Sequence, residues 1–197
     1  MKRYLIVVDV QNDFCPGGSL AVEAGDVIIP NINKLMRDGD FDMVIATQDW
    51  HPADHISFAQ NWKGAEVFTQ VDAPYGKQML WPTHCVAGTA GAEFRPSLDI
   101  KPIHFIIRKG YRVEVDSYSA FKENDKVTET GLGKLIDRGS EVHICGIATD
   151  VCVINTAMDA LDYSGHVHVA LDACAGVTVE GVEAAIEDMK RFGIYTY

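Results

Sequence analysis

Short apolar runs alternate with segments of helical spacing along most of the chain, and this alternation limits the folds available to it. We expect buried strands at residues 3–10, 43–48, 103–108, 141–145 and 167–171, and a short terminal strand at 194–197. We expect helices at about 26–38, at 130–138, from about 152 to 161, and at 179–192. Strands that are apolar on both faces and alternate with helices are typical of βαβ units. The sequence therefore predicts an α/β fold with an open, mainly parallel β-sheet and helices on both faces.

Length, charge and cysteine content narrow the class of protein. The 197 residues are enough for one domain with a sizeable core, and we expect a single domain over 1–197. A net charge of −11 without a basic run argues against a nucleic-acid partner. No apolar run has the length of a membrane span, and Asp9 interrupts the first one too early for an export signal. Five cysteines without a CxxC pair then indicate a cytoplasmic protein with reduced thiols.

The stretch from residue 51 to residue 101 departs from the alternation. It is polar, rich in proline and aromatic residues, and too long for a simple connection in a compact domain. Loops of this kind usually carry function or cover a site. We expect this stretch to pack over the carboxyl edge of the sheet.

Residues 146–153 connect a predicted strand to a predicted helix and place Cys152 in the first turn of that helix. Backbone N–H groups there lack intrahelical partners, and the helix dipole favours negative charge. A thiol at such a position tends to have a lowered pKa and to be a usable nucleophile. The alternative is a buried cysteine that acts as a small apolar side chain, which is the commoner case for an arbitrary cysteine.

Four reactive groups fall at the ends of four different predicted strands. These are Asp9, the pair Asp49 and His51, Lys109, and Cys152. Ligands of open α/β sheets bind outside the carboxyl ends of the strands. Because the four positions converge independently on one edge, we predict an active site there.

Asp9, Lys109 and Cys152 form the first candidate constellation. A cysteine nucleophile needs a base for its proton and a group that stabilises the resulting negative charge. A carboxylate and an ammonium can do both, since Lys109 would keep Asp9 charged and lower the thiol pKa. The alternative for Asp9 and Lys109 is a structural salt bridge between two strands.

Asp49, His51 and His84 form the second constellation. An Asp-x-His pair at a strand exit with a later histidine can make a three-ligand metal site that keeps positions open. His55 is a rival ligand, and each histidine taken singly is more often an ordinary loop residue. The other four histidines lie in predicted strands, where we assign them no function: His104, His143, His166 and His168.

Six motifs together resemble the nicotinamidases, which belong to the isochorismatase-like cysteine hydrolases. The motifs lie in the order of that family between residue 5 and about residue 176. They are Asp9–Phe14, Asp49–Pro52, Trp81–Cys85, Lys109–Gly110, Asp116–Phe121 and Gly146–Val153. The resemblance implies the isochorismatase-like form of the α/β fold, a Rossmann-like three-layer sandwich.

By position, the resemblance implies that Asp9, Lys109 and Cys152 are the catalytic triad. It implies that the metal ligands are Asp49, His51 and His84, which would hold one divalent ion, with zinc expected first and iron or manganese as alternatives. The role of His55 stays open, because only some relatives have a ligand at this position.

Three further expectations come from the resemblance alone. Phe14 and Trp81 match aromatic residues that hold the pyridine ring of the substrate. The Ile147–Ala148 peptide bond is expected to be cis, with the N–H groups of Ala148 and Cys152 facing one oxyanion. The length of the loop between His55 and Trp81 departs from the family pattern, which affects the pocket rim rather than the chemistry.

The implied activity is hydrolysis of nicotinamide to nicotinate and ammonia through a cysteine thioester, in NAD salvage, with pyrazinamide-like analogues as further substrates. A related amidase on another small amide would lack the metal ligands, and an isochorismatase would lack Cys152. A metal-binding or redox-sensing module without turnover is the alternative from another class. The sequence leaves open the metal identity, the breadth of amide substrates and the oligomeric state, a homo-oligomer included.

Overall fold

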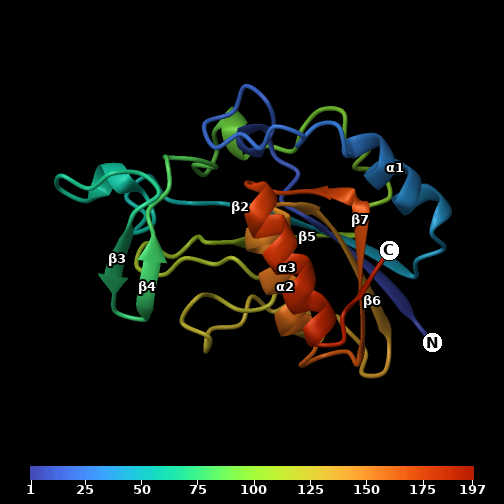
Figure 1. Ribbon diagram of the computed structural model, residues 1–197. Helices are drawn as coiled ribbons and strands as arrows, with labels where there is room; N and C mark the ends of the chain where they lie inside the picture. The colour runs from blue at the N-terminus through green and yellow to red at the C-terminus, as the bar shows by residue number, and fades with distance from the viewer.

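Six parallel strands form the central sheet of the computed structural model, which describes residues 1–197 (Figure 1). Their order across the sheet is β5-β2-β1-β6-β7-β8, and every neighbouring pair is parallel. The strands are β1 Arg3–Val8, β2 Met43–Asp49, β5 Phe105–Lys109, β6 Glu141–Ile147, β7 His166–Ala175 and β8 Tyr195–Thr196. The predicted parallel α/β sheet is confirmed, with strand ends shifted by a few residues and a longer β7.

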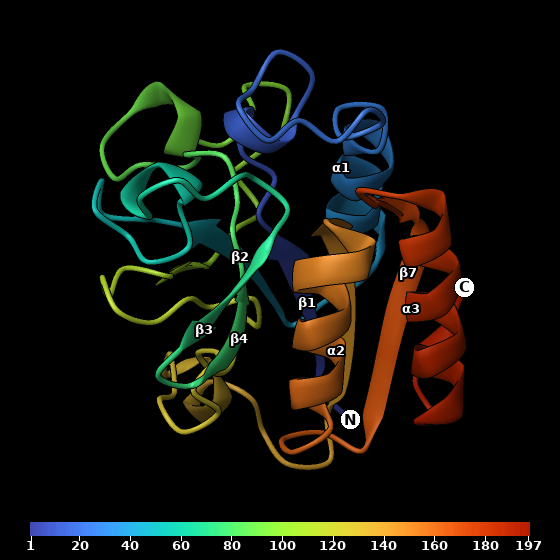
Figure 2. The ribbon, with the colours of Figure 1, turned by 60° about the vertical axis from the view of Figure 1, so that its left-hand side comes forward.

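Helices cover both faces of this sheet, as predicted (Figures 1 and 2). Alternate side chains of β1 point to opposite faces, because a strand has a period of two. Leu5 and Val7 belong to the core that α1 completes, and Ile6 and Val8 belong to the core under α2 and α3. The helices are α1 Ile29–Asp38, α2 Ile154–Ala160 and α3 Val179–Arg191.

The predicted helix at 130–138 is wrong. Only a single 3₁₀ turn, Leu132–Lys134, forms between β5 and β6. Gly131 has φ of +96°, in the left-handed region, and a Cβ at Gly133 would lie 2.1 Å from the Tyr163 ring. These glycines therefore permit a tight turn against Tyr163 where the apolar spacing had indicated a helix.

The first helix starts later than predicted, at Ile29 rather than near residue 26. Pro30 occupies its first turn, where the missing N–H costs no hydrogen bond. The helix ends at Asp38, as predicted, and Gly39 follows it. Glycines after a helix often adopt a left-handed conformation, but Gly39 does not; here the nearby Phe41 ring leaves no space for a side chain. Gly39 has φ of −80°, and a Cβ there would lie 2.2 Å from the Phe41 ring.

The stretch from residue 51 to residue 101 has its own small structure. It contains the 3₁₀ turns Ala59–Asn61 and Ala90–Ala92 and the antiparallel hairpin of β3 (Gln70–Ala73) and β4 (Gly76–Met79). The hairpin stands beside the main sheet, outside the helical layers (Figure 2). Other parts of the stretch cover the carboxyl edge and supply Trp81 and His84 to the pocket there, as predicted. None of the helices has both the length and the apolar character needed to cross a membrane.

Gly146 lies where β6 packs closely against β1. Its φ is +120°, and a Cβ would lie 2.1 Å from the backbone oxygen of Val8. We expect Gly146→Ala to lower the free energy of unfolding by about 3 kcal/mol or more, because it adds left-handed strain to a backbone overlap. Gly165→Ala is the matched control, since nothing lies within 4 Å of its added methyl. Urea unfolding measures both, and equal midpoints would contradict this account.

Candidate active site

The reactive groups predicted at four strand ends do lie together. Asp9 follows β1, Asp49 and Lys109 are the last residues of β2 and β5, and Cys152 follows β6. Asp49 and Lys109 are direct partners in the β2–β5 register. Because these four strands are consecutive in the sheet order, their carboxyl ends bring the four side chains to one place.

Lys109 is the centre of the group, and its side chain is fully buried. Its Nζ lies 2.8 Å from Asp9 Oδ2, 2.5 Å from Asp49 Oδ1 and 3.5 Å from Cys152 Sγ. It also donates a hydrogen bond of 2.9 Å to the carbonyl of Ser117. One ammonium group thus joins the two constellations that the sequence analysis treated separately.

The two carboxylates around Lys109 differ in their surroundings. Burial raises the pKa of Asp9 to about 6, although Lys109 opposes this shift. Burial also acts to raise the pKa of Asp49, but Lys109 and His51 outweigh it and hold that pKa well below its usual value. Asp49 therefore stays charged, whereas Asp9 can exchange a proton near neutral pH.

Backbone and hydroxyl contacts hold Asp9 in place. Its φ of +48° lies in the left-handed region, which Asp tolerates better than most residues. Its N–H donates to Thr47 Oγ1 at 3.1 Å, and that hydroxyl donates to Asp9 Oδ1 at 2.6 Å. Oδ2, the oxygen beside Lys109, accepts no hydrogen bond of good geometry. This oxygen is the one available to receive a proton.

The sequence pattern predicts Cys152 in the first turn of an α-helix. The structure instead places it in a π-helical turn, Thr149–Val153, that precedes α2. Burial raises the pKa of its thiol well above the ordinary value, and Lys109 opposes this only in part. The expected lowering of the thiol pKa is therefore wrong, because desolvation and the nearby carboxylates outweigh the ammonium. The resting group is a thiol, with Asp9 and Asp49 oxygens within 4.8 Å of its sulfur.

The turn before Cys152 also has the backbone arrangement that the resemblance implies. The Ile147–Ala148 peptide bond is cis. The carbonyl of Ala148 accepts hydrogen bonds of 3.0 Å from Val151 and Val153, whereas its N–H has no acceptor in the protein. Ala148 lines the same pocket as Cys152, so this N–H is a donor without a protein acceptor in a residue of the pocket lining.

Asp49, His51 and His84 fit a metal ion. Each offers a ligand atom, and these atoms lie within 4.8 Å of one another. The Nδ1–H groups of His51 and His84 each donate a 2.7 Å hydrogen bond, to the carbonyls of Gly110 and Pro82. Such bonds fix the tautomer in which Nε2 can bind a metal. Burial and His51 lower the pKa of His84 to about 4, so its imidazole is neutral, as a ligand must be.

His55 is less suited to be a ligand than its rivals. Its Nδ1 lies 2.7 Å from Ser57 Oγ, and its Nε2 lies 3.2 Å from the carbonyl of Val115. Both ring nitrogens already have protein partners. These contacts favour the set of Asp49, His51 and His84.

The histidines to which we assigned no function lie outside the site. His143 stacks on His168 with ring centroids 4.6 Å apart, close to Glu141. Arg3 Nε holds that carboxylate at 3.2 Å. An arginine at the shared carboxylate explains this cluster as a structural ion-pair network.

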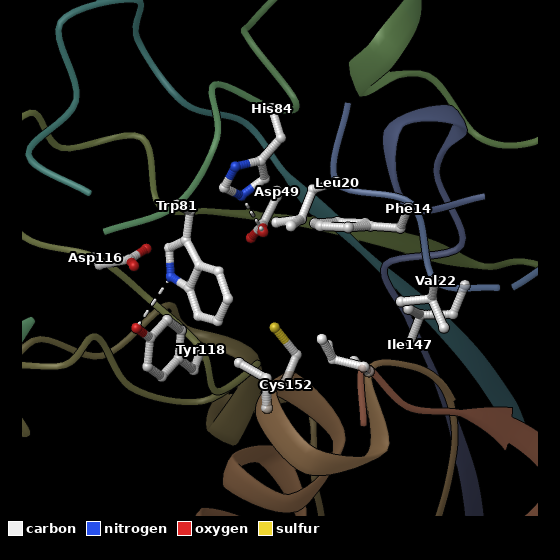
Figure 3. A pocket seen from close by; sticks show the side chains of 13 residues that line it. Phe14, Leu20, Val22, Asp49, Trp81, His84, Asp116, Tyr118, Ile147 and Cys152 are labelled. Atoms are coloured by element: carbon white, nitrogen blue, oxygen red, sulfur yellow. Dashed lines mark hydrogen bonds and ion pairs between the residues drawn. The ribbon is translucent and has the colours of Figure 1, made fainter. Parts of the chain in front are cut away.

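An apolar pocket opens onto the sulfur of Cys152. Phe14 and Trp81 stand on either side of it, with the sulfur between them and His84 and Asp49 at one end (Figure 3). Other lining residues were not identified from the sequence: Leu20, Val22, Asp116, Tyr118, Ile147, Val151 and Val177. Asp116 and Tyr118 lie in a motif of the resemblance that carried no assigned role. Apart from Ile147, which ends β6, the apolar ones come from loops and turns whose packing gives no local sequence signal.

Comparisons with known proteins agree with this geometry. A family model described as the isochorismatase domain matches residues 3–196. A nicotinamidase of Acinetobacter baylyi is 50% identical over 193 residues, which cover 96% of this chain and 89% of that protein.

Solved structures are similar over the whole chain. A nicotinamidase/pyrazinamidase of Acinetobacter baumanii has a TM-score of 0.92 and 48% identity, covering 99% of this chain and 95% of that one. A pyrazinamidase of Pyrococcus horikoshii in complex with zinc has a TM-score of 0.79 and 37% identity, covering 100% and 99%.

The ligand assignment predicts the metal content of variants. His84→Ala removes one of three donors, so we expect the purified protein to lose most of its bound metal while it stays folded. His166→Ala is the control, because His166 is exposed and distant from the ligand groups. Elemental analysis of both proteins, with circular dichroism for the fold, measures the difference. Equal metal content in the two variants would contradict the assignment.

Proposed function

Because the chain belongs to the isochorismatase family, we propose that the site assembled around Lys109 is that of a nicotinamidase, which hydrolyses nicotinamide to nicotinate and ammonia in NAD salvage. One observation carries the proposal: Lys109 contacts Asp9, Asp49 and Cys152, and two of these, Asp49 and Cys152, line an apolar pocket with aromatic walls. The family match over residues 3–196 also supports one domain over the whole chain.

The first chemical step forms the carbon–sulfur bond. Asp9 takes the thiol proton of Cys152 as the sulfur attacks the carboxamide carbon, so no free thiolate has to persist in the buried site. The carbonyl electron pair moves to the oxygen. The N–H groups of Ala148 and Cys152 hold this oxyanion, and Lys109 stabilises the negative charge that develops beside it.

The second step breaks the carbon–nitrogen bond. Asp9 returns its proton to the departing nitrogen, which leaves as ammonia, and a thioester of Cys152 remains. Asp9 then removes a proton from a water molecule that attacks the thioester carbon. Nicotinic acid forms and leaves as nicotinate after its acid proton passes to solvent, the proton on Asp9 returns to the sulfur, and Asp9 is a carboxylate again. A carboxyl pKa of about 6 suits both directions of proton transfer.

Orientation of the ring falls to two parts of the site. Phe14 and Trp81 would hold the faces of the pyridine. Asp49, His51 and His84 would hold a divalent ion, zinc first, with iron and manganese as alternatives. When bound, this ion supplies a coordination point for the ring nitrogen, directly or through its water. A ring fixed in this way presents its carboxamide to Cys152.

Ammonia release from nicotinamide tests the function and its nucleophile together. We expect wild-type turnover and a loss of at least about a thousandfold in Cys152→Ala, because no other group can form the thioester. Cys174→Ala is the matched control and should keep wild-type turnover, since its thiol lies outside the pocket. An inactive wild-type enzyme would refute the function, and an active Cys152→Ala would refute the nucleophile.

Asp9→Asn tests whether Asp9 acts as a catalytic base or only as an ion-pair partner of Lys109. The amide keeps the shape but cannot accept the proton, so we expect kcat to fall by about 10²–10⁴-fold. Asp49 still neutralises Lys109 in this variant, so the protein should fold and retain its metal. Steady-state kinetics and elemental analysis measure the two effects. Near-normal kcat would show that Asp9 serves only as an ion-pair partner.

A further inference from the structure

Gln78 is the only buried residue of the β3–β4 hairpin. A small two-stranded hairpin would normally pack an apolar side chain inward, because a buried amide costs free energy unless its hydrogen bonds are made. Here the buried residue is Gln78, and both its amide nitrogen and its amide oxygen make hydrogen bonds. This unusual choice points to a role for the polar contacts themselves.

The amide nitrogen of Gln78 faces three acceptors. Its Nε2 lies 2.7 Å from the carbonyl of Met79, 2.9 Å from Asp116 Oδ2 and 3.1 Å from the hydroxyl of Tyr118. A carbonyl and a carboxylate can only accept, so this orientation of the amide is fixed by its neighbours. Its Oε1 in turn accepts a 2.8 Å hydrogen bond from Tyr75.

Tyr118 links this amide to the pocket. Its hydroxyl also accepts a 3.2 Å hydrogen bond from Trp81 Nε1. Figure 3 shows the indole of Trp81 along one wall of the pocket, with its nitrogen turned away from Cys152 and toward Tyr118. The hydroxyl therefore receives two donors, one from the hairpin and one from the pocket wall, and the second sets the plane of the indole.

We infer that Gln78 is a positioning residue for substrate binding: through Tyr118 it holds the indole of Trp81 as the wall against which the pyridine ring of a carboxamide substrate lies. This inference rests on the proposed function and extends it to the hairpin. Gln78 itself does not line the pocket, and it acts on the ring rather than on the carboxamide carbon. Its loss should thus weaken binding in the ground state and the transition state alike, which raises KM and leaves kcat.

Gln78→Met tests the inference, because it keeps the length of the side chain and removes the amide. We expect a KM for nicotinamide about tenfold higher, with kcat within about twofold of wild type. Gln70→Met makes the same substitution at an exposed position of the same hairpin and should leave both constants unchanged. A wild-type KM in a folded, active Gln78→Met enzyme would overturn the inference and leave the proposed function standing. No ammonia release by the wild type would instead refute the function.

Tyr118→Phe distinguishes positioning from general destabilisation. It removes the shared hydroxyl and should raise KM by a similar factor, and the double variant should be no worse than either single one, because both act through the same contact. Multiplied effects in the double variant would overturn the inference. If Gln78→Met fails to fold, Gln78→Asn decides, because it keeps a buried amide but is one methylene too short for the contact with Tyr118: a raised KM with unchanged kcat supports the inference, and a wild-type KM overturns it.

Discussion

The buried ammonium of Lys109 is the interaction on which the rest of the site depends. A charge without water around it costs several kcal/mol unless opposite charges and hydrogen bonds compensate it. Asp49 and Asp9 do so, and against the opposing effect of burial they hold the pKa of Lys109 well above its usual value. Because these residues end or follow β5, β2 and β1, the ion pairs also fix the carboxyl ends of three strands relative to one another.

The same group couples the two functions of the site. Asp49 Oδ2 lies 3.5 Å from His51 Nε2, and Asp49 Oδ1 faces Lys109. Lys109 Nζ in turn lies 3.5 Å from Cys152 Sγ. In the proposed function, only the side chain of Lys109 therefore separates the carboxylate of the metal site from the nucleophile. Because both groups of residues contact the same lysine, the proposed metal-binding and nucleophilic parts of the site fix each other's positions.

Burial determines how the nucleophile works. The thiol of Cys152 has a raised pKa, because desolvation outweighs Lys109, and the base beside it has a pKa near neutrality. In the proposed mechanism, proton transfer from Cys152 to Asp9 therefore accompanies the attack of the sulfur on the carboxamide carbon. A protonated thiol is also a weaker target for oxidants than a thiolate.

The sequence by itself determined the parallel sheet, the helices on both faces and the residues at the strand ends, because apolar periodicity and strand exits are local properties. It led to a wrong helix at 130–138, where Gly131 and Gly133 pack against the distant Tyr163. Only the tertiary structure decided that Lys109 bridges Asp9 and Asp49, that the pKa of Cys152 rises, and that Gln78 reaches Trp81 through Tyr118. Burial and electrostatic balance depend on every neighbour in space, and those neighbours come from segments far apart in the chain.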